Sequence, residues 1–164
     1  MSTGQRIGQS AGEGRGFFKP WMKVALVTII FAVLAMALGN VIWPPAEGGP
    51  EPTSGQVASF IILAVLTALT FGLGISFLLF GFPLVRKVVG GSKLRVWAAY
   101  LSIGWLLVSW WPHGSLHAHV GENIQQLLYI EYGFHVPSYL AGLVLADCFV
   151  AVARERSDEA ASGG

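Results

Sequence analysis

Two long stretches of the chain contain no charged residue and consist mainly of apolar side chains. They cover residues 24–43 and 57–85. A helix needs about 20 mostly apolar residues to cross a hydrocarbon core of roughly 30 Å. Only 12% of all residues are charged and 54% are hydrophobic, whereas a soluble domain is about 25% charged. The chain therefore has too little charge to cover a water-soluble fold or to remain disordered, and we expect an integral membrane protein.

Two further stretches complete the predicted set of membrane spans. Residues 96–112 form a shorter stretch that is also free of charge, and 124–153 contains no Lys or Arg. Continuous apolar runs such as 60–66 do not alternate in the way that a strand of a membrane β-barrel requires. The sequence thus predicts an all-α integral membrane protein with a four-transmembrane-helix bundle, whose spans are about 24–43, 57–85, 96–112 and 124–153.

The basic residues predict the orientation of these spans. All ten Lys and Arg residues precede the first span, lie between the second and third, or follow the fourth, and the connections 44–56 and 113–123 contain none. Short loops rich in Lys and Arg remain in the cytoplasm. We therefore predict a multi-pass protein of the cell membrane with both termini cytoplasmic. Its parts are an N-terminal tail (1–23), a transmembrane domain (24–153) and a C-terminal tail (154–164).

The N-terminal span admits a second interpretation. A basic leader followed by an apolar run that contains Ala35, Met36 and Ala37 also resembles a secretory signal peptide with its cleavage site. The run continues to Trp43, which is longer than a usual signal core, and an indole suits the membrane interface. We expect the span to be retained, with cleavage as the alternative.

Small side chains recur along one face of each of the first two spans. The second span carries four of them at intervals of four residues, and the first carries five at intervals of three or four. They are Ala64, Ala68, Gly72 and Ser76, and Ala25, Thr28, Ala32, Ala35 and Gly39. Helices in lipid approach closely where such residues meet. The stripes predict close helix packing and say nothing about chemistry.

All four histidines of the chain fall between positions 113 and 135. His113, His117 and His119 follow the third span, and His135 lies in the fourth. Neutral imidazole is the commonest metal ligand in proteins. In an extended segment His117 and His119 would point to one side, whereas in a helix His113 and His117 would share a face. Both backbone conformations allow two imidazoles to converge.

The fourth span supplies groups that complement these histidines. Glu131 lies four residues before His135, on the same helical face, and Pro137 predicts a kink beside them. A carboxylate commonly orients a metal-bound imidazole, or it binds the metal itself. We therefore predict an outward-facing metal site, with Glu122 as an alternative carboxylate. Its ligands are His113, His117, His119, His135 and Glu131.

The donor atoms favour some metals over others. Nitrogen and oxygen donors suit zinc, copper or iron, and the single cysteine, Cys148, is expected near the opposite end of the fourth span. Haem held between two histidines is a weaker alternative, because only His135 clearly lies within a span. A metal-free polar network is the other alternative, since the chain lacks a standard motif such as His-Glu-x-x-His.

The sequence leaves the biochemical activity open. The leading hypothesis is transition-metal binding, for metal handling or for a redox or hydrolytic step at the membrane. The alternative is a non-catalytic membrane subunit or scaffold whose histidines form a polar, pH-responsive network. A small transporter would have to oligomerise to enclose a path. Besides the lipid bilayer, the expected partners are another membrane protein or a second copy of the chain, and a net charge of +1 argues against nucleic acid.

Overall fold

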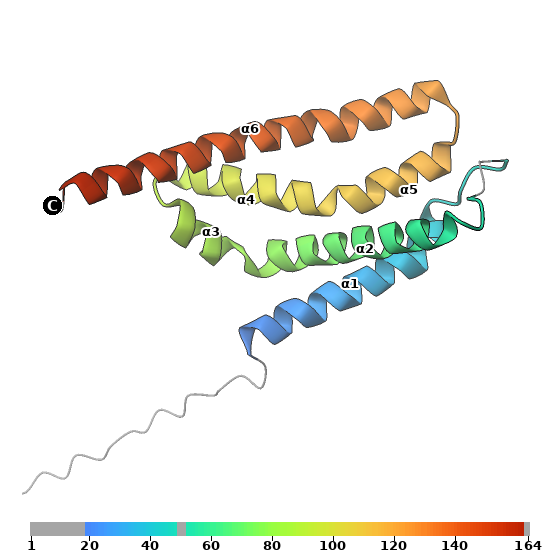
Figure 1. Cartoon of the computed structure of the whole chain (residues 1–164), viewed down its shortest axis with the longest axis horizontal. Helices are drawn as coiled ribbons and strands as arrows, with labels where there is room; N and C mark the ends of the chain where they lie inside the picture. The colour runs from blue at the N-terminus through green and yellow to red at the C-terminus, as the bar shows by residue number, and fades with distance from the viewer. Residues whose placement is uncertain (1–18, 49–51, 163–164) are drawn as a thin grey trace, which may run out of the picture.

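The structure is a computed structural model that describes residues 19–48 and 52–162. Within these residues the chain forms helices and no strand, which confirms the predicted all-helical class. The six helices are α1 (Pro20–Ile42), α2 (Val57–Phe80), α3 (Phe82–Val89), α4 (Lys93–Val108), α5 (Trp110–Val120) and α6 (Ile124–Ser162). All except the short α3 run roughly along the long axis of the molecule (Figure 1). Most of the predicted N-terminal tail lies outside the described residues.

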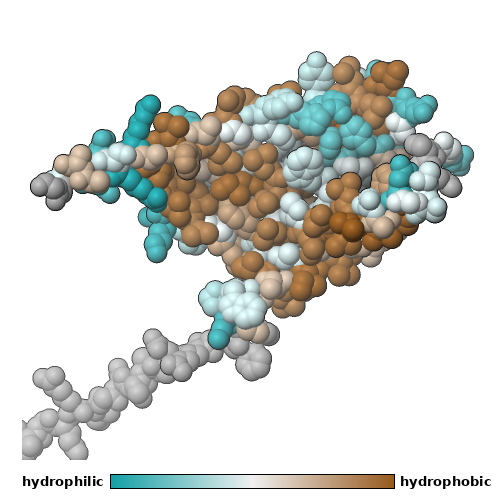
Figure 2. Space-filling model, viewed as in Figure 1, coloured by the Kyte–Doolittle hydropathy of each residue, from teal (hydrophilic) through white to brown (hydrophobic). Residues whose placement is uncertain are grey.

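Three of the helices, α1, α2 and α6, are long and apolar enough to cross a membrane. Their large aliphatic side chains point outward: Ile29, Leu63 and Leu143 are 56%, 57% and 68% exposed. Figure 2 shows a broad hydrophobic surface, with hydrophilic groups gathered near the C-terminal end of α6 and over α5 and α6. An apolar surface of this extent is unfavourable in water and favourable in lipid.

Helices α4 and α5 follow one nearly continuous path. Only Ser109 separates them, and its dihedral angles are helical (φ −69°, ψ −25°). The N–H of Ser109 donates to the carbonyl of Trp105 (2.9 Å), and the N–H of His113 donates to the carbonyl of Ser109 (3.1 Å). The predicted loop 113–123 is therefore wrong for most of its length, because helical hydrogen bonding continues up to Gly121.

Other helix boundaries differ from the prediction for local reasons. The predicted span 57–85 is divided into α2 and α3 at Gly81, two residues before Pro83, which has no backbone N–H to continue the hydrogen bonds of α2. α3 ends at Val89 and is capped by Gly90, whose φ of +61° is a conformation that favours glycine. In contrast, α6 continues through Pro137 and into the predicted C-terminal tail.

The predicted small-residue stripes meet where α1 packs against α2. A Cβ atom added to Gly72 would lie 2.1 Å from the carbonyl oxygen of Thr28, so the two backbones touch at this point. The hydroxyl of Ser76, which is fully buried, donates to the carbonyl of Val24 at 3.2 Å. This contact confirms close packing through small side chains. The other buried residues of the contact are Ala32, Ala35 and Ala68.

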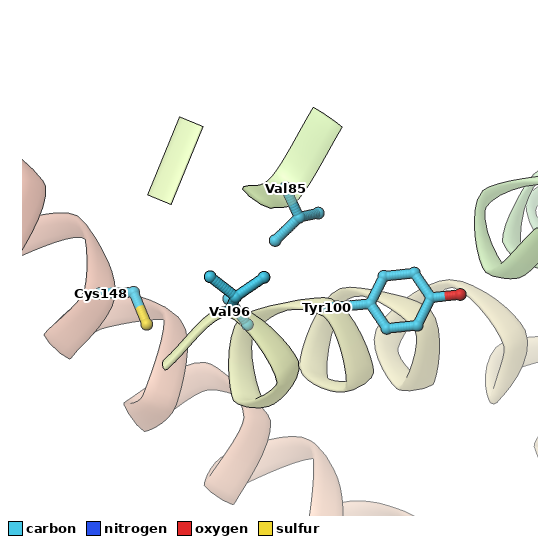
Figure 3. Close-up of a cluster of buried hydrophobic side chains, with 5 residues drawn as sticks. Val85, Val96, Tyr100 and Cys148 are labelled. Atoms are coloured by element: carbon cyan, nitrogen blue, oxygen red, sulfur yellow. The ribbon is translucent and has the colours of Figure 1, made fainter. Parts of the chain in front are cut away.

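A second buried cluster joins α3, α4 and α6 (Figure 3). Val85 comes from α3, Val96 and Tyr100 from α4, and Cys148 from α6. The Tyr100 hydroxyl also donates to a backbone carbonyl near the C-terminal end of α2. Cys148 lies about 20 Å along α6 from the last histidine, at about 1.5 Å per residue. The cysteine is thus part of an apolar core and remote from the histidines, as predicted.

Basic side chains gather at one end of the molecule. The start of α1, the α3–α4 region and the C-terminal part of α6 lie at that end (Figure 1), and together they carry every Lys and Arg of the described residues. Arg95 of α4 pairs with Glu155 of α6 at 2.7 Å. The hydrogen bond from the Arg95 guanidinium to this carboxylate raises the pKa of Arg95 above its ordinary value. α5 and the first half of α6 lie at the other end.

Candidate metal centre

Helix α5 presents His113 and His117 side by side, because residues four apart lie on one face of a helix. Their Nε2 atoms are 3.1 Å apart, and the two rings meet edge to face with centroids 4.5 Å apart. α5 ends at Val120 and is capped by Gly121, whose φ of +57° is a conformation that favours glycine. Asn123 then starts α6 by accepting a hydrogen bond from the N–H of Gln126 (3.1 Å). This short turn brings α6 back alongside α5.

Helix α6 presents Glu131 and His135 in the same way. The Nδ1 atom of His135 contacts Oε2 of Glu131 within α6. The other oxygen of the carboxylate, Oε1, lies 3.1 Å from Nε2 of His117 on α5. Glu131 therefore bridges a histidine on its own helix and a histidine on the facing helix.

The four side chains His113, His117, Glu131 and His135 form one group, which we call the His/Glu cluster. The rings of His113 and His135, from different helices, have centroids 5.0 Å apart. One ligand atom from each of His113, Glu131 and His135 lies within 4.8 Å of the other two. His117 adds a nitrogen that contacts both His113 and Glu131.

The spacing of these atoms is close to that of a metal site. Two nitrogens about 2.0–2.1 Å from a tetrahedral zinc ion are about 3.4 Å apart. The His113–His117 nitrogen pair and the His117–Glu131 nitrogen–oxygen pair are each separated by 3.1 Å. The same separation is also that of an ordinary hydrogen bond. The cluster is therefore compatible with a bound metal ion and with a hydrogen-bonded network.

The His/Glu cluster is half-buried in a hydrophobic surface. The side chains of His117, Glu131 and His135 are 33%, 41% and 44% exposed. Figure 2 shows a hydrophilic patch over α5 and α6, bordered by hydrophobic atoms. Ionisable groups at membrane depth are costly unless they pair with one another or face a polar interior. The contacts among the four side chains meet the first of these conditions, and the remaining exposure leaves a route for an ion or ligand.

A cavity of about 220 Å³ adjoins His113 and His135. Two of the residues that line it, Phe134 and Ser138, were not predicted from the sequence. The Phe134 ring packs against His113 with centroids 5.3 Å apart, and Ser138 accepts a hydrogen bond from Nε1 of Trp105 (3.1 Å). They lie three and seven residues after Glu131, the spacing of one helical face, so the period of α6 was the signal that could have identified them.

The structure does not bring His119 into the His/Glu cluster. On a helix, His119 lies about 200° around the axis from His117, so the two side chains diverge; only an extended backbone would have aligned them. Nδ1 of His119 instead lies 2.6 Å from the carbonyl oxygen of Pro44, in the connection between α1 and α2. The alternative carboxylate, Glu122, is exposed in the turn before α6, and Glu131 is the acid that contacts the histidines.

The His/Glu cluster thus offers imidazole nitrogens and carboxylate oxygens, and it contains no thiolate. Such a set can hold a metal ion, bind a proton or orient a polar ligand. No known protein family, curated protein or solved structure matches the chain.

Proposed function

We propose that the protein is a multi-pass membrane protein that binds a transition-metal ion between α5 and α6. The ligands are drawn from the His/Glu cluster: His113, His117, His135 and the carboxylate of Glu131. The observation that carries this proposal is the convergence of three of the four histidines of the chain with one carboxylate, from two facing helices. A lone histidine at a membrane interface is explained by hydrogen bonding alone. Two donors at an interval of four residues on each of two facing helices favour a shared ligand.

The donor set limits the chemistry of the bound ion. Nitrogen and oxygen ligands suit zinc, copper(II) or iron. If Glu131 binds the ion together with the three histidines, the coordination is closed and suits metal handling. If Glu131 instead orients His135, three histidines leave a position open to water or substrate. An open position suits a redox or hydrolytic step on a molecule that reaches the site through the membrane.

Metal analysis of the full chain, purified in detergent without a chelator, tests the proposal. We expect one zinc, copper or iron ion per chain. After removal of this ion, reloading with Co²⁺ should restore one ion per chain and produce visible absorption bands of a nitrogen- and oxygen-ligated site. Purified protein that contains no metal and takes up no stoichiometric Co²⁺ would contradict the proposal.

A metal-free polar network is the second candidate. It is favoured by the hydrogen-bond separation of His117 and Glu131 (3.1 Å) and by the need to pair ionisable groups at membrane depth. In this case the protein is a non-catalytic membrane subunit or scaffold, and its partner is another membrane protein or a second copy of the chain. The expected results are then the absence of stoichiometric metal and co-purification of one constant partner.

The proposed topology has four passes, formed by α1, α2, the consecutive pair α4 and α5, and α6, with both termini in the cytoplasm. The path from Lys93 to Val120 is about 42 Å long at about 1.5 Å per residue, which exceeds a hydrocarbon core of roughly 30 Å. The connection 44–56, the last two turns of α5 and the short turn before α6 contain no Lys or Arg, as expected of segments at the outer side of the cell membrane.

Cysteine labelling in intact cells checks this topology. A membrane-impermeant maleimide is expected to label Glu47→Cys, at an exposed site between α1 and α2, and to label Arg156→Cys near the C-terminal end of α6 only after lysis. The native Cys148 is 6% exposed, so background labelling of its thiol should be low. Labelling of Arg156→Cys in intact cells would place the C-terminus outside and contradict the four-pass topology.

A further inference from the structure

A second cavity lies between α3 and α4, at the end of the molecule opposite the His/Glu cluster. Its volume is about 730 Å³, and Phe82, Arg86, Gly90, Lys93 and Trp97 are among the residues that line it. It is formed where the chain reverses between the two helices, with positive φ angles at the consecutive glycines that join them. None of its residues takes part in the proposed metal site.

The cavity between α3 and α4 is positively charged. Arg86 and Lys93 line it and no acidic residue does. Within residues 19–48 and 52–162, neither of these two cations forms an ion pair. Arg95, close by in the sequence, is by contrast neutralised by Glu155 at 2.7 Å. A guanidinium and an ammonium without carboxylate partners favour an anion, and phosphate is the anion that both groups commonly bind in proteins.

The surroundings of this cavity favour a lipid as the source of the phosphate. Leu84 and Val88 on α3 are 61% and 51% exposed, and Leu94 on α4 is 79% exposed. The Trp97 ring packs against Phe82 with centroids 4.6 Å apart, and an indole at the end of an apolar helix is typical of the membrane interface. A phospholipid matches both features, because its phosphate complements the cations and its acyl chains complement the outward aliphatic side chains. A soluble phosphate ester matches the cations alone.

We infer that the cavity between α3 and α4 binds the phosphate group of an anionic phospholipid. The site differs from general attraction of basic loops to the membrane surface in one testable respect. Arg86 and Lys93 line the cavity, whereas Lys87, which is adjacent to Arg86 in α3, does not. The effect of removing a positive charge on lipid binding should therefore depend on the position of that charge as well as on the number of charges removed.

Native mass spectrometry of the full chain in detergent tests this inference, with phosphatidylglycerol and phosphatidylcholine as the lipid probes. The wild-type chain should retain phosphatidylglycerol in preference to phosphatidylcholine. The variant Arg86→Gln with Lys93→Gln should bind phosphatidylglycerol about 10–30-fold more weakly, from the loss of two phosphate contacts. The matched control, Lys23→Gln with Lys87→Gln, removes the same charge from exposed positions outside the cavity and should retain the lipid.

Three results would overturn the inference. Equal loss of lipid in the control variant would show general attraction to the basic end of the protein. Equal retention of the two lipids would show that the anionic headgroup is not recognised. Complete displacement of phosphatidylglycerol by millimolar inorganic phosphate would assign the cavity to a soluble phosphate ester, whereas persistence of the lipid in that buffer supports the lipid as the natural ligand.

Discussion

Replacement of both His113 and His135 with alanine is expected to lower the affinity of the protein for Co²⁺ or Zn²⁺ by about 100-fold or more. Loss of a single residue that merely orients a ligand costs about 10–100-fold in metal affinity, and this variant removes two direct donors from two helices. Both rings contribute atoms to the group of three that lies within 4.8 Å. Titration of the metal-free protein in detergent, followed by Co²⁺ absorption or calorimetry, measures the change. Alanine favours helix, so circular dichroism should show unchanged helix content.

His119→Ala is the matched control for the metal measurement. It removes the same kind of side chain from the same helix, but His119 contacts the carbonyl of Pro44 and lies outside the His/Glu cluster. The metal affinity of His119→Ala should remain close to that of the wild-type chain. The metal affinity of His117→Ala should fall between that of His119→Ala and that of the double variant. Comparable weakening by His119→Ala, or undiminished binding by the double variant, would show that the ion does not bind where we propose.

Addition of a single methyl group at Gly72 is expected to destabilise the protein by about 1–3 kcal/mol or more, as overpacking of a close contact does. The added Cβ would lie 2.1 Å from Thr28 O and 3.0 Å from Ala32 N. Both are backbone atoms, so α1 and α2 must separate to accommodate it. A loss of about 2 kcal/mol corresponds to a decrease in the melting temperature of roughly 4–8 °C. Thermal unfolding of Gly72→Ala in detergent, followed by circular dichroism, measures this decrease.

Gly142→Ala serves as the control for Gly72→Ala. It makes the same substitution inside a helix, α6, but no atom lies within 4 Å of the added Cβ. Alanine is favoured over glycine in a helix by about 1 kcal/mol, so this variant should match or exceed the wild-type melting temperature. An unchanged melting temperature in Gly72→Ala would mean that the α1–α2 contact is looser than the structure describes.

Local sequence patterns predicted much of the helical architecture. The uncharged run over residues 57–85 led to a helix because lipid leaves a spanning backbone no hydrogen-bonding partner outside itself. The small-residue stripe that contains Gly72 identified the buried face of α2, because close backbone approach requires small side chains. Hydropathy could not divide that run at Gly81, since the residues of α3 that follow are also mainly apolar. Its division depends on glycine and proline at particular positions.

The candidate site was predicted less completely. Glu131 and His135 were paired correctly from their spacing within one helix. Their counterpart on α5 remained ambiguous because an extended segment would have aligned His117 with His119, and a helix aligns His117 with His113. Helical hydrogen bonds through Ser109 resolve that choice. Phe134, which packs on His113, was missed because the period of α6 places it on the face of Glu131 but does not identify the helix that this face contacts.

The sequence by itself therefore determined the helical class of the protein, the apolar helices able to span a membrane and the residues rich in metal-binding atoms. These properties depend on composition and on spacing within single helices. Only the tertiary structure decided that α5 continues α4, that Glu131 contacts histidines on both helices, and that His119 turns to Pro44. The physical reason is that the side chains of two helices meet at angles set by the turn that joins them and by the helices packed around them.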